Sequence, residues 1–248
     1  MIAQWAKPAT CLPAACFCEE VRPSPLAQPA NAISSLAFVA AAVAVIATRR
    51  SALRGNRREN LMLSAAVYTR LYATALLVIG IGSAYYHAAL TFAGQTADVA
   101  GMYLLVTFVL LYNAGRLWPI RAGVMAIGYA GINITMIAVM VAVPSLRRFL
   151  FTAVLLAAIA LEIRIRMAGG DRSNVRLFVA ALASLALGFA FWLLDISHIV
   201  CSPASLVQGH AVWHLCGAIA GLLVYLYYLS EGAGVSDHPV VTSRNAGE

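Results

Sequence analysis

Apolar residues are gathered into seven long runs, and the short stretches between these runs hold most of the charged residues. The runs cover residues 32–48, 71–90, 99–115, 122–143, 149–163, 177–196 and 209–230. A helix needs about 20 apolar residues to cross the hydrocarbon core of a bilayer, and most of the runs are near that length. The pattern therefore predicts an all-α protein, a bundle of seven transmembrane helices. The fifth run is the shortest and carries Glu162 near its end.

The segments on either side of this bundle differ from it in composition. Residues 1–31 are rich in proline and alanine and are expected to form an irregular N-terminal segment, whereas residues 231–248 form a polar tail. Residues 32–230 form the membrane domain between them. An amphipathic stretch, Leu61–Tyr68, precedes the second apolar run.

Basic residues are divided unequally between the two sides of the predicted bundle. Twelve lie on the side of the first loop and the C-terminus: Arg49, Arg50, Arg54, Arg57, Arg58, Arg116, Arg121, Arg164, Arg166, Arg172, Arg176 and Arg244. Four lie on the other side: Lys7, Arg22, Arg147 and Arg148. Because loops rich in lysine and arginine stay in the cytoplasm, we expect the N-terminus outside and the C-terminal tail in the cytoplasm.

The composition narrows the class of protein further. Hydrophobic residues make up 62% of the 248 residues, charged residues make up 11%, and the mean hydropathy is +0.82. A soluble domain has about a quarter of its residues charged, so the chain is predicted to be an integral, multi-pass membrane protein. The formal net charge of +7 lies in short loops, where it orients the helices, and therefore does not indicate a nucleic-acid partner.

Hydroxyl and ionisable side chains gather where the second run ends and the third begins. Ser83 and His87 are four positions apart, so on a helix they share one face and lie about 6 Å apart along the axis. Asp98 follows just before the third run. Ionisable groups in a membrane span are costly, and they therefore indicate a functional site.

The seventh run supplies two further candidates, His210 and His214, which are also four positions apart on one helical face. In the expected orientation, the second run ends on the extracytoplasmic side, and the third and seventh runs begin there. The three histidines would then lie at the same depth as Ser83 and Asp98, provided that the three helices touch. The active site is therefore expected toward the extracytoplasmic side.

Three histidines in this arrangement are a ligand set for zinc, with a fourth position left for water. Zinc lowers the pKa of its water and polarises a carbonyl group, which is the chemistry of hydrolysis. In this interpretation the metal ligands are His87, His210 and His214. Asp98 accepts the proton of the water or orients an imidazole, and Ser83 donates a hydrogen bond to the developing oxyanion.

Other interpretations use the same residues differently. Ser83, His87 and Asp98 can form a serine-type triad for lipid hydrolysis, although this leaves His210 and His214 without a role. A seven-span receptor or transport-like protein would use the metal structurally. Haem held between His87 and His214 would give a visible absorption band. Taken singly, each of these residues is also explained by helix packing or by its place at a helix end. The interpretation as a metal site therefore depends on all of them lying at the same depth in the membrane.

Two more polar residues lie at the outer end of the sixth run. Asp195 and His198 are three positions apart. Asp195 is a candidate to support the metal ligands through hydrogen bonds. His198 is interpreted as the polar end of a helix.

Short motifs follow one another along nearly the whole chain. They are Cys18-Glu19-Glu20, Asn31-x-x-Ser34, Gly82-Ser83-x-x-x-His87, Asp98, Phe191-Trp192-x-x-Asp195 and His210-Ala211-x-Trp213-His214. This ordered set resembles the alkaline ceramidase family, part of a superfamily of seven-span membrane metal hydrolases that includes progestin/adiponectin-type receptors. The resemblance implies hydrolysis of ceramide, or of a related N-acyl lipid that enters from the bilayer, to a sphingoid base or amine and a fatty acid.

The resemblance also implies roles for single residues. It implies zinc ligation by His87, His210 and His214, with Ser83 and Asp98 as catalytic partners.

Two further features of the family concern the N-terminal segment. Cys18 and Cys201 match a pair that is bridged in the family, and both would lie outside, where oxidation is permitted. A calcium site before the first span would use Glu19. However, Phe17, Val21 and Gln28 stand where the family has a tryptophan, an asparagine and an acidic ligand, which weakens the case for Ca²⁺.

Overall fold

A computed structural model describes residues 5–10, 16–54, 60–118, 120–169 and 173–231. Arg57, Arg58, Arg172, Arg244 and the predicted tail beyond residue 231 lie outside these residues. In the described ranges, all elements of regular secondary structure longer than an isolated bridge are helices. This confirms the predicted all-α class.

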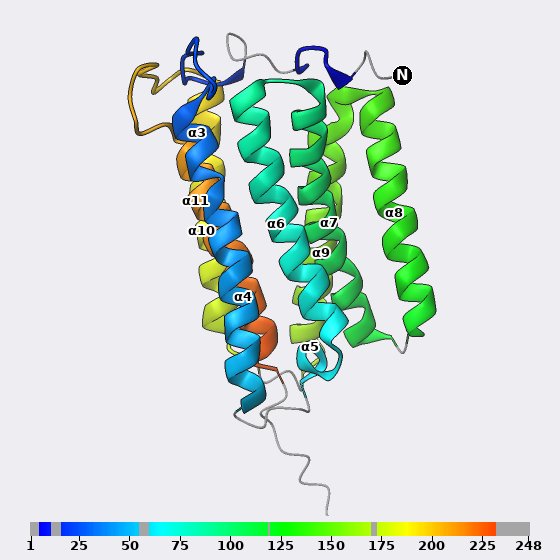
Figure 1. The fold of residues 1–248 in the computed structure, drawn as a ribbon. Helices are drawn as coiled ribbons and strands as arrows, with labels where there is room; N and C mark the ends of the chain where they lie inside the picture. Colours follow the sequence, from blue (N-terminus) through cyan, green and yellow to red (C-terminus); the bar gives the residue numbers. More distant parts are fainter. Residues whose placement is uncertain (1–4, 11–15, 55–59, 119, 170–172, 232–248) are drawn as a thin grey trace, which may run out of the picture.

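Long helices run alternately up and down the bundle (Figure 1). The helices are α3 (Pro29–Ser34), α4 (Leu36–Arg54), α5 (Leu61–Ser64), α6 (Ala66–Ala89), α7 (Phe92–Leu117), α8 (Ala122–Ala142), α9 (Arg147–Met167), α10 (Val175–Ile196) and α11 (Gly209–Leu229). A single 3-10 turn, Pro144–Leu146, joins α8 to α9. Side chains help to define two of the starts, because Thr91 caps α7 and Asn174 caps α10.

Six helices of the described chain are long and apolar enough to cross a membrane. They are Pro29–Arg54 (α3 with α4), α6, α7, α8, α10 and α11. The predicted multi-pass membrane class is therefore confirmed, whereas the number of seven spans and their orientation stay predictions. The seventh long helix, α9, runs alongside α7 but carries Arg147, Arg148, Glu162, Arg164 and Arg166 near its ends.

Two boundary predictions were wrong. The third run was expected to begin at residue 99, but α7 already begins at Phe92, so Asp98 lies within this helix. The first apolar run was expected to end at residue 48 and to be followed by an arginine-rich loop, but α4 continues to Arg54. Arg49, Arg50 and Arg54 therefore lie on the helix. The physical reason is that arginine is a good helix former and can extend its long side chain toward the polar interface.

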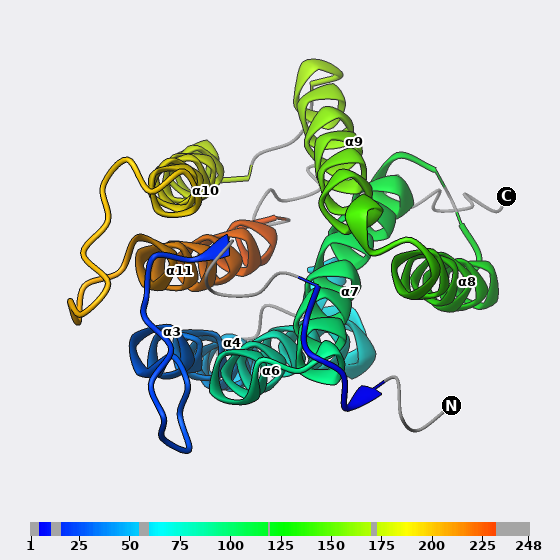
Figure 2. The ribbon, with the colours of Figure 1, turned by 90° about the horizontal axis from the view of Figure 1, so that it is seen from above.

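The helices form two groups around α7 (Figure 2). Starting beside α7, the helices α6, α4, α11 and α10 pack in succession on one side, and α8 and α9 lie on the other. The contact of α6 with α7 is very close, because a Cβ atom on Gly82 would lie 2.7 Å from the Ala97 carbonyl carbon. Similarly, a Cβ atom on Gly101 would lie 2.5 Å from the Ile79 nitrogen. Small residues allow such backbone approach between membrane helices, and here they bring Ser83 beside α7.

The N-terminal segment covers the upper end of the bundle in Figure 1, where α6 ends and α7 and α11 begin. The predicted disulfide between Cys18 and Cys201 is confirmed, and it ties this segment to the connection between α10 and α11. The Glu20 N–H also donates to the Pro203 carbonyl at 3.1 Å. The expectation of an irregular segment up to residue 31 needs one correction, since α3 already begins at Pro29.

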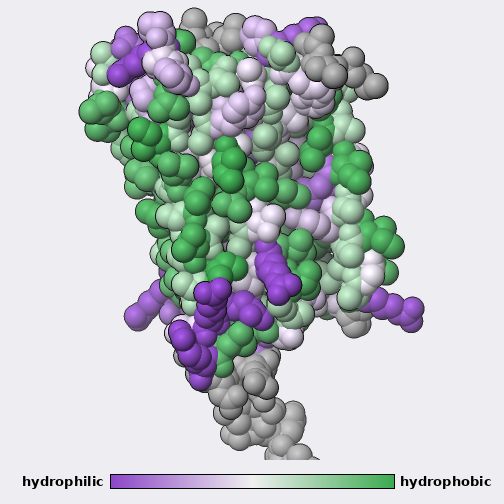
Figure 3. Space-filling view, in the orientation of Figure 1, coloured by the Kyte–Doolittle hydropathy of each residue, from purple (hydrophilic) through white to green (hydrophobic). Residues whose placement is uncertain are grey.

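The two ends of the bundle differ in chemistry. The upper end in Figure 1, called the histidine end below, carries His87, His210 and His214. The lower end, called the arginine end, carries the arginines at the end of α4 and the start of α6. Between the two ends, hydrophobic side chains cover most of the surface seen in Figure 3. Such an apolar girdle is the surface that a bilayer requires.

Candidate metal centre

Three buried histidines meet at the histidine end. His87 comes from the last turn of α6, and His210 and His214 come from the first turns of α11. Their candidate ligand atoms all lie within 4.8 Å of one another, and the Nε2 atoms of His87 and His210 are 3.2 Å apart. The structure therefore brings together the three residues that the sequence predicted as metal ligands.

The ring of His87 is oriented by a side chain that sequence analysis did not assign to the site. His87 Nδ1 lies 2.8 Å from Gln28 Oε1, and Gln28 Nε2 donates to the Glu19 carbonyl at 2.9 Å. The second bond fixes the orientation of the Gln28 amide, so its oxygen faces the ring. His87 must then carry its proton on Nδ1, which leaves the Nε2 lone pair facing His210.

The ring of His214 is oriented in the same way by the first transmembrane segment. Its Nδ1 atom lies 2.9 Å from the Ser34 hydroxyl oxygen, and that hydroxyl donates to the Asn31 carbonyl at 3.0 Å. Because the Ser34 proton is used, the hydroxyl oxygen accepts the proton on His214 Nδ1. The Nε2 atom of His214 is therefore unprotonated and carries the lone pair that a metal would use.

His210 is held through its backbone. Its N–H donates to Asp195 Oδ2 at 3.1 Å, and the other carboxylate oxygen accepts the Cys18 N–H at 3.1 Å. Asp195 is fully buried and thus joins the end of α10 to the start of α11 and to the N-terminal segment. Sequence analysis expected Asp195 near the ligands, and the structure places it there as a support of the backbone. His198, in contrast, is exposed.

The donor set fits a divalent metal. Two of the imidazoles have their tautomer set so that Nε2 is unprotonated, and the Nδ1 atom of His210 has no partner among the described residues. Three neutral, buried imidazole nitrogens with a fourth position open are the ligands of a catalytic zinc site. All three side chains are less than 9% exposed, so the cluster is buried within the bundle.

Ser83 and Asp98 lie beside the histidines. The Ser83 hydroxyl oxygen is 3.2 Å from His214 Nε2 and 3.0 Å from the Ser35 hydroxyl oxygen, and it also hydrogen-bonds the Asp98 carboxylate. Ser83 thus lies between Asp98 and the cluster. The serine-type alternative needs His87 as the base of Ser83, but the ring nitrogens of His87 lie at hydrogen-bond distance from Gln28 and His210.

Phe17 covers the cluster from the N-terminal segment. Its ring centroid lies 5.1 Å from that of His87 and 4.3 Å from that of His210, and the side chain is buried. In the sequence, Phe17 stands out only as a departure from a family motif. Its place beside the bridged Cys18 was the one available signal that it would lie over the site.

Below the histidines, a cavity of about 660 Å³ extends into the membrane domain. Phe17, His210, His214 and Asp98 line its upper part. Apolar side chains of α7, α9 and α10 form its walls, including Val99, Met102, Leu155, Ile159, Leu182 and Leu185. The helices α9 and α10 make little direct contact, and Figure 2 shows them apart on this side of the bundle.

The lower part of this cavity is polar. Glu162 lines it and is only 2% exposed, and its carboxylate accepts hydrogen bonds from Arg116 and Tyr227. Asn113 lies there as well and accepts a hydrogen bond from Tyr228 at 2.8 Å. Arg116 was predicted to lie in a polar loop, which was wrong, because α7 continues to Leu117. The Arg116 guanidinium turns inward to pair with the Glu162 carboxylate on α9.

Glu19, the calcium candidate, holds the start of α3. Its two carboxylate oxygens accept the N–H groups of Ala30 and Asn31 at 2.7 and 2.9 Å. Burial raises the pKa of the Glu19 carboxyl above its ordinary value, and the two N–H groups partly oppose this rise. Ca²⁺ binding stays a prediction, and the contacts observed for Glu19 are those of a structural residue.

The chain was compared with known proteins. The family model described as Ceramidase matches residues 15–235, a range that includes α3 to α11 and every residue of the cluster. None of the curated proteins compared with the chain matches it.

Proposed function

The chain belongs to the ceramidase family, and from this premise we propose that it is a zinc-dependent membrane amidase. The family implies a hydrolase that acts on the amide bond of ceramide. The proposed reaction releases a fatty acid and a sphingoid base from ceramide, or a fatty acid and an amine from a related N-acyl lipid. The observation that carries the proposal is the histidine cluster, with Ser83 and Asp98, at the end of an apolar cavity.

The cavity supports an N-acyl lipid as the substrate class. Its upper end offers polar groups to an amide, and its apolar walls offer burial to an alkyl chain. A substrate from the bilayer already has its alkyl chain out of water, so the apolar walls keep that chain in an equivalent environment and the polar groups at the upper end provide the recognition. We propose that the substrate enters from the bilayer between α9 and α10, where the helices make little contact.

Zinc is the proposed metal, and His87, His210 and His214 would hold it. When bound, it would polarise the amide carbonyl and lower the pKa of a water molecule. The neutral nitrogens that Gln28 and Ser34 keep directed into the cluster support this assignment.

Ser83 and Asp98 have separate proposed roles. The Ser83 hydroxyl donates a hydrogen bond to the carbonyl oxygen as negative charge develops on it. The Asp98 carboxylate accepts a proton from the attacking water while the new C–O bond forms. It then donates that proton to the amide nitrogen as the C–N bond breaks, so that the amine leaves neutral.

We further propose seven spans with the histidine end on the extracytoplasmic side. The excess of arginine at the opposite end supports this orientation through the positive-inside rule. The disulfide between Cys18 and Cys201 lies at the histidine end and supports it independently, because such bonds persist in oxidising compartments.

The test combines elemental analysis of the purified protein with release of fatty acid from a panel of N-acyl lipids. We expect about one zinc per chain and amidase activity, and we expect His214→Ala to lose both. His198→Ala is the matched control, since it removes an exposed histidine outside the cluster. Ser83→Ala should keep the metal and lose about 10²–10³-fold in kcat. A His214→Ala protein that retained both its metal and its activity would overturn the proposal.

A further inference from the structure

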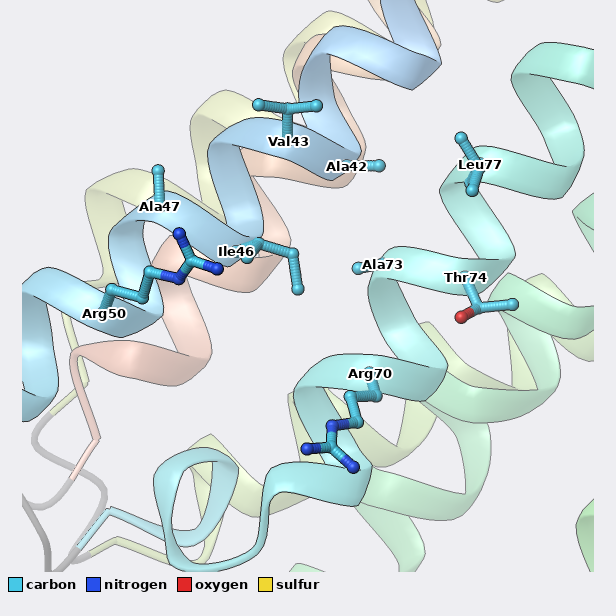
Figure 4. Close-up of a pocket in the computed structure, with 9 residues that line it drawn as sticks. All are labelled: Ala42, Val43, Ile46, Ala47, Arg50, Arg70, Ala73, Thr74 and Leu77. Atoms are coloured by element: carbon cyan, nitrogen blue, oxygen red, sulfur yellow. The ribbon is translucent and has the colours of Figure 1, made fainter.

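A second hollow lies on the outer surface of the bundle, between α4 and α6 and toward the arginine end (Figure 4). Its volume is about 380 Å³, and it shares none of its lining residues with the cavity below the histidines. Both helices are membrane spans, so this groove opens to the surrounding lipid. It is therefore a site separate from the proposed active site.

The upper part of the groove is apolar. Ala42 and Ala73 lie at the contact between the two helices, and their small side chains leave room that Val43, Ile46 and Leu77 enclose (Figure 4). Val43 is 65% exposed and Leu77 is 39% exposed. A surface of this kind in a membrane span is covered by the alkyl chain of a lipid.

Two arginines form the lower part of the groove. Arg50 lies near the end of α4 and Arg70 near the start of α6, and Figure 4 shows both side chains extending toward the space between the helices. Both are exposed, and in the part of the chain that the structure describes neither has an acidic partner. The protein therefore places two positive charges at the edge of an apolar groove without compensating them.

We propose that this groove binds an anionic glycerophospholipid. Its phosphate would lie between Arg50 and Arg70, and one acyl chain would cover Val43, Ile46 and Leu77. Arginine is suited to phosphate because its planar guanidinium donates two parallel hydrogen bonds. Basic pockets between transmembrane helices on the cytoplasmic side are the kind of site that holds anionic headgroups.

The chemistry of the groove distinguishes this lipid from other ligands. A free phosphate ion would leave the apolar wall uncovered, and a neutral lipid such as ceramide would leave both guanidinium groups unpaired. A lipid bound here would bridge α4 and α6. Because α6 carries Ser83 and His87, the bound lipid would stabilise the helices that support the metal centre.

The proposal is tested by the thermal stability of the full-length protein in detergent, with phosphatidylglycerol, phosphatidylcholine of the same acyl chains, or inorganic phosphate added. We expect phosphatidylglycerol at saturation to raise the Tm by about 5 °C or more. Phosphatidylcholine should raise it less, and inorganic phosphate at the same concentration should leave it unchanged. A shift with inorganic phosphate equal to that with phosphatidylglycerol would overturn the proposal, since it would show an anion site without a lipid.

Variants of the groove test whether phosphatidylglycerol raises the Tm by binding there. Arg50→Gln/Arg70→Gln should bind phosphatidylglycerol about tenfold more weakly or worse. The matched control is Arg121→Gln/Arg176→Gln, which removes the same charge from exposed positions outside the groove and should keep the full shift. Ala47→Trp provides a second test, because it fills the groove from an exposed position and leaves both arginines in place. Equal shifts in the wild type and in all three variants would show that the lipid binds elsewhere.

Discussion

At the scale of single residues, the candidate metal centre depends on hydrogen bonds to the Nδ1 atoms of two candidate ligands, His87 and His214. An imidazole has two nitrogens, and a metal needs the one without a proton. Gln28 Oε1 accepts the proton on His87 Nδ1 at 2.8 Å, and the Ser34 hydroxyl oxygen accepts the proton on His214 Nδ1 at 2.9 Å. In both rings the Nε2 atom is left without a proton. Both come from the N-terminal 34 residues, whereas the ligands come from α6 and α11. The N-terminal part of the chain thus fixes the tautomers of candidate ligands that are distant in the sequence.

Replacing Gln28 by leucine tests this role. Gln28→Leu removes the acceptor of the His87 Nδ1 proton, so we expect the affinity for zinc to fall about 10–100-fold. The measurement is a competition titration of the purified protein with a chelator. Asn113→Leu is the matched control, because Asn113 is an equally buried amide that lies away from the histidines. It should lower the Tm and leave the zinc affinity unchanged; a similar loss of affinity in both variants would show that Gln28 acts only through stability.

At the scale of helices, two features decide how the site is assembled. The first is the close contact of α6 with α7 at Gly82, which brings Ser83 to Asp98. The second is the polar cluster on α9, whose Glu162 is buried against Arg116 of α7. This pairing explains how a helix with charges near its ends belongs to the bundle, since a buried charge is tolerated when it is paired and hydrogen-bonded.

The glycine contact can be tested by adding one methyl group. In Gly82→Ala the new Cβ would meet the Ala97 backbone at 2.7 Å, so α6 and α7 must move apart. We expect a loss of about 1–3 kcal/mol in stability, and lower amidase activity because Ser83 and Asp98 separate. Gly128→Ala is the control, since no atom lies within 4 Å of its added Cβ. It should be neutral or stabilise α8 by up to about 1 kcal/mol. Thermal unfolding and fatty-acid release measure both effects, and wild-type values for Gly82→Ala would contradict the argument.

At the scale of the whole molecule, segments that are distant in the sequence meet around the histidine cluster. The N-terminal segment supplies Phe17 as a cover and the backbone N–H of Cys18 to Asp195. The disulfide from Cys18 to Cys201 closes a separation of 183 residues and holds this segment in place. A bridge over so long a separation restricts the unfolded chain strongly.

Removing the bridge should therefore affect both stability and the site. For Cys18→Ser/Cys201→Ser we expect about 2–4 kcal/mol less stability, a lower Tm and weaker zinc binding. The control is Cys216→Ala, which changes a buried free cysteine and keeps the bridge. It should retain its zinc affinity. If the double variant bound zinc as the wild type does, the N-terminal segment would hold its place without the disulfide.

The sequence alone determined where most of the helices lie and which residues are the candidate ligands. Hydropathy and span length are local properties, so each predicted run overlaps an observed helix, although α4 continues to Arg54, α6 begins at Ala66 and α7 begins at Phe92. The spacing of His210 and His214 is also local, because residues four apart share a helical face. The polar residues in apolar runs then marked the site, since membrane spans hold few such groups.

Only the tertiary structure decided how these residues are used. Gln28, Ser34 and Phe17 belong to the site because their segment folds over α6 and α11, and no pattern in the sequence states that packing. The cavity and the groove between α4 and α6 are likewise spaces between helices. Periodicity shows which face of a helix is apolar, but hydrogen-bond partners and hollows depend on which helices meet and at what distance, and these arise only from packing.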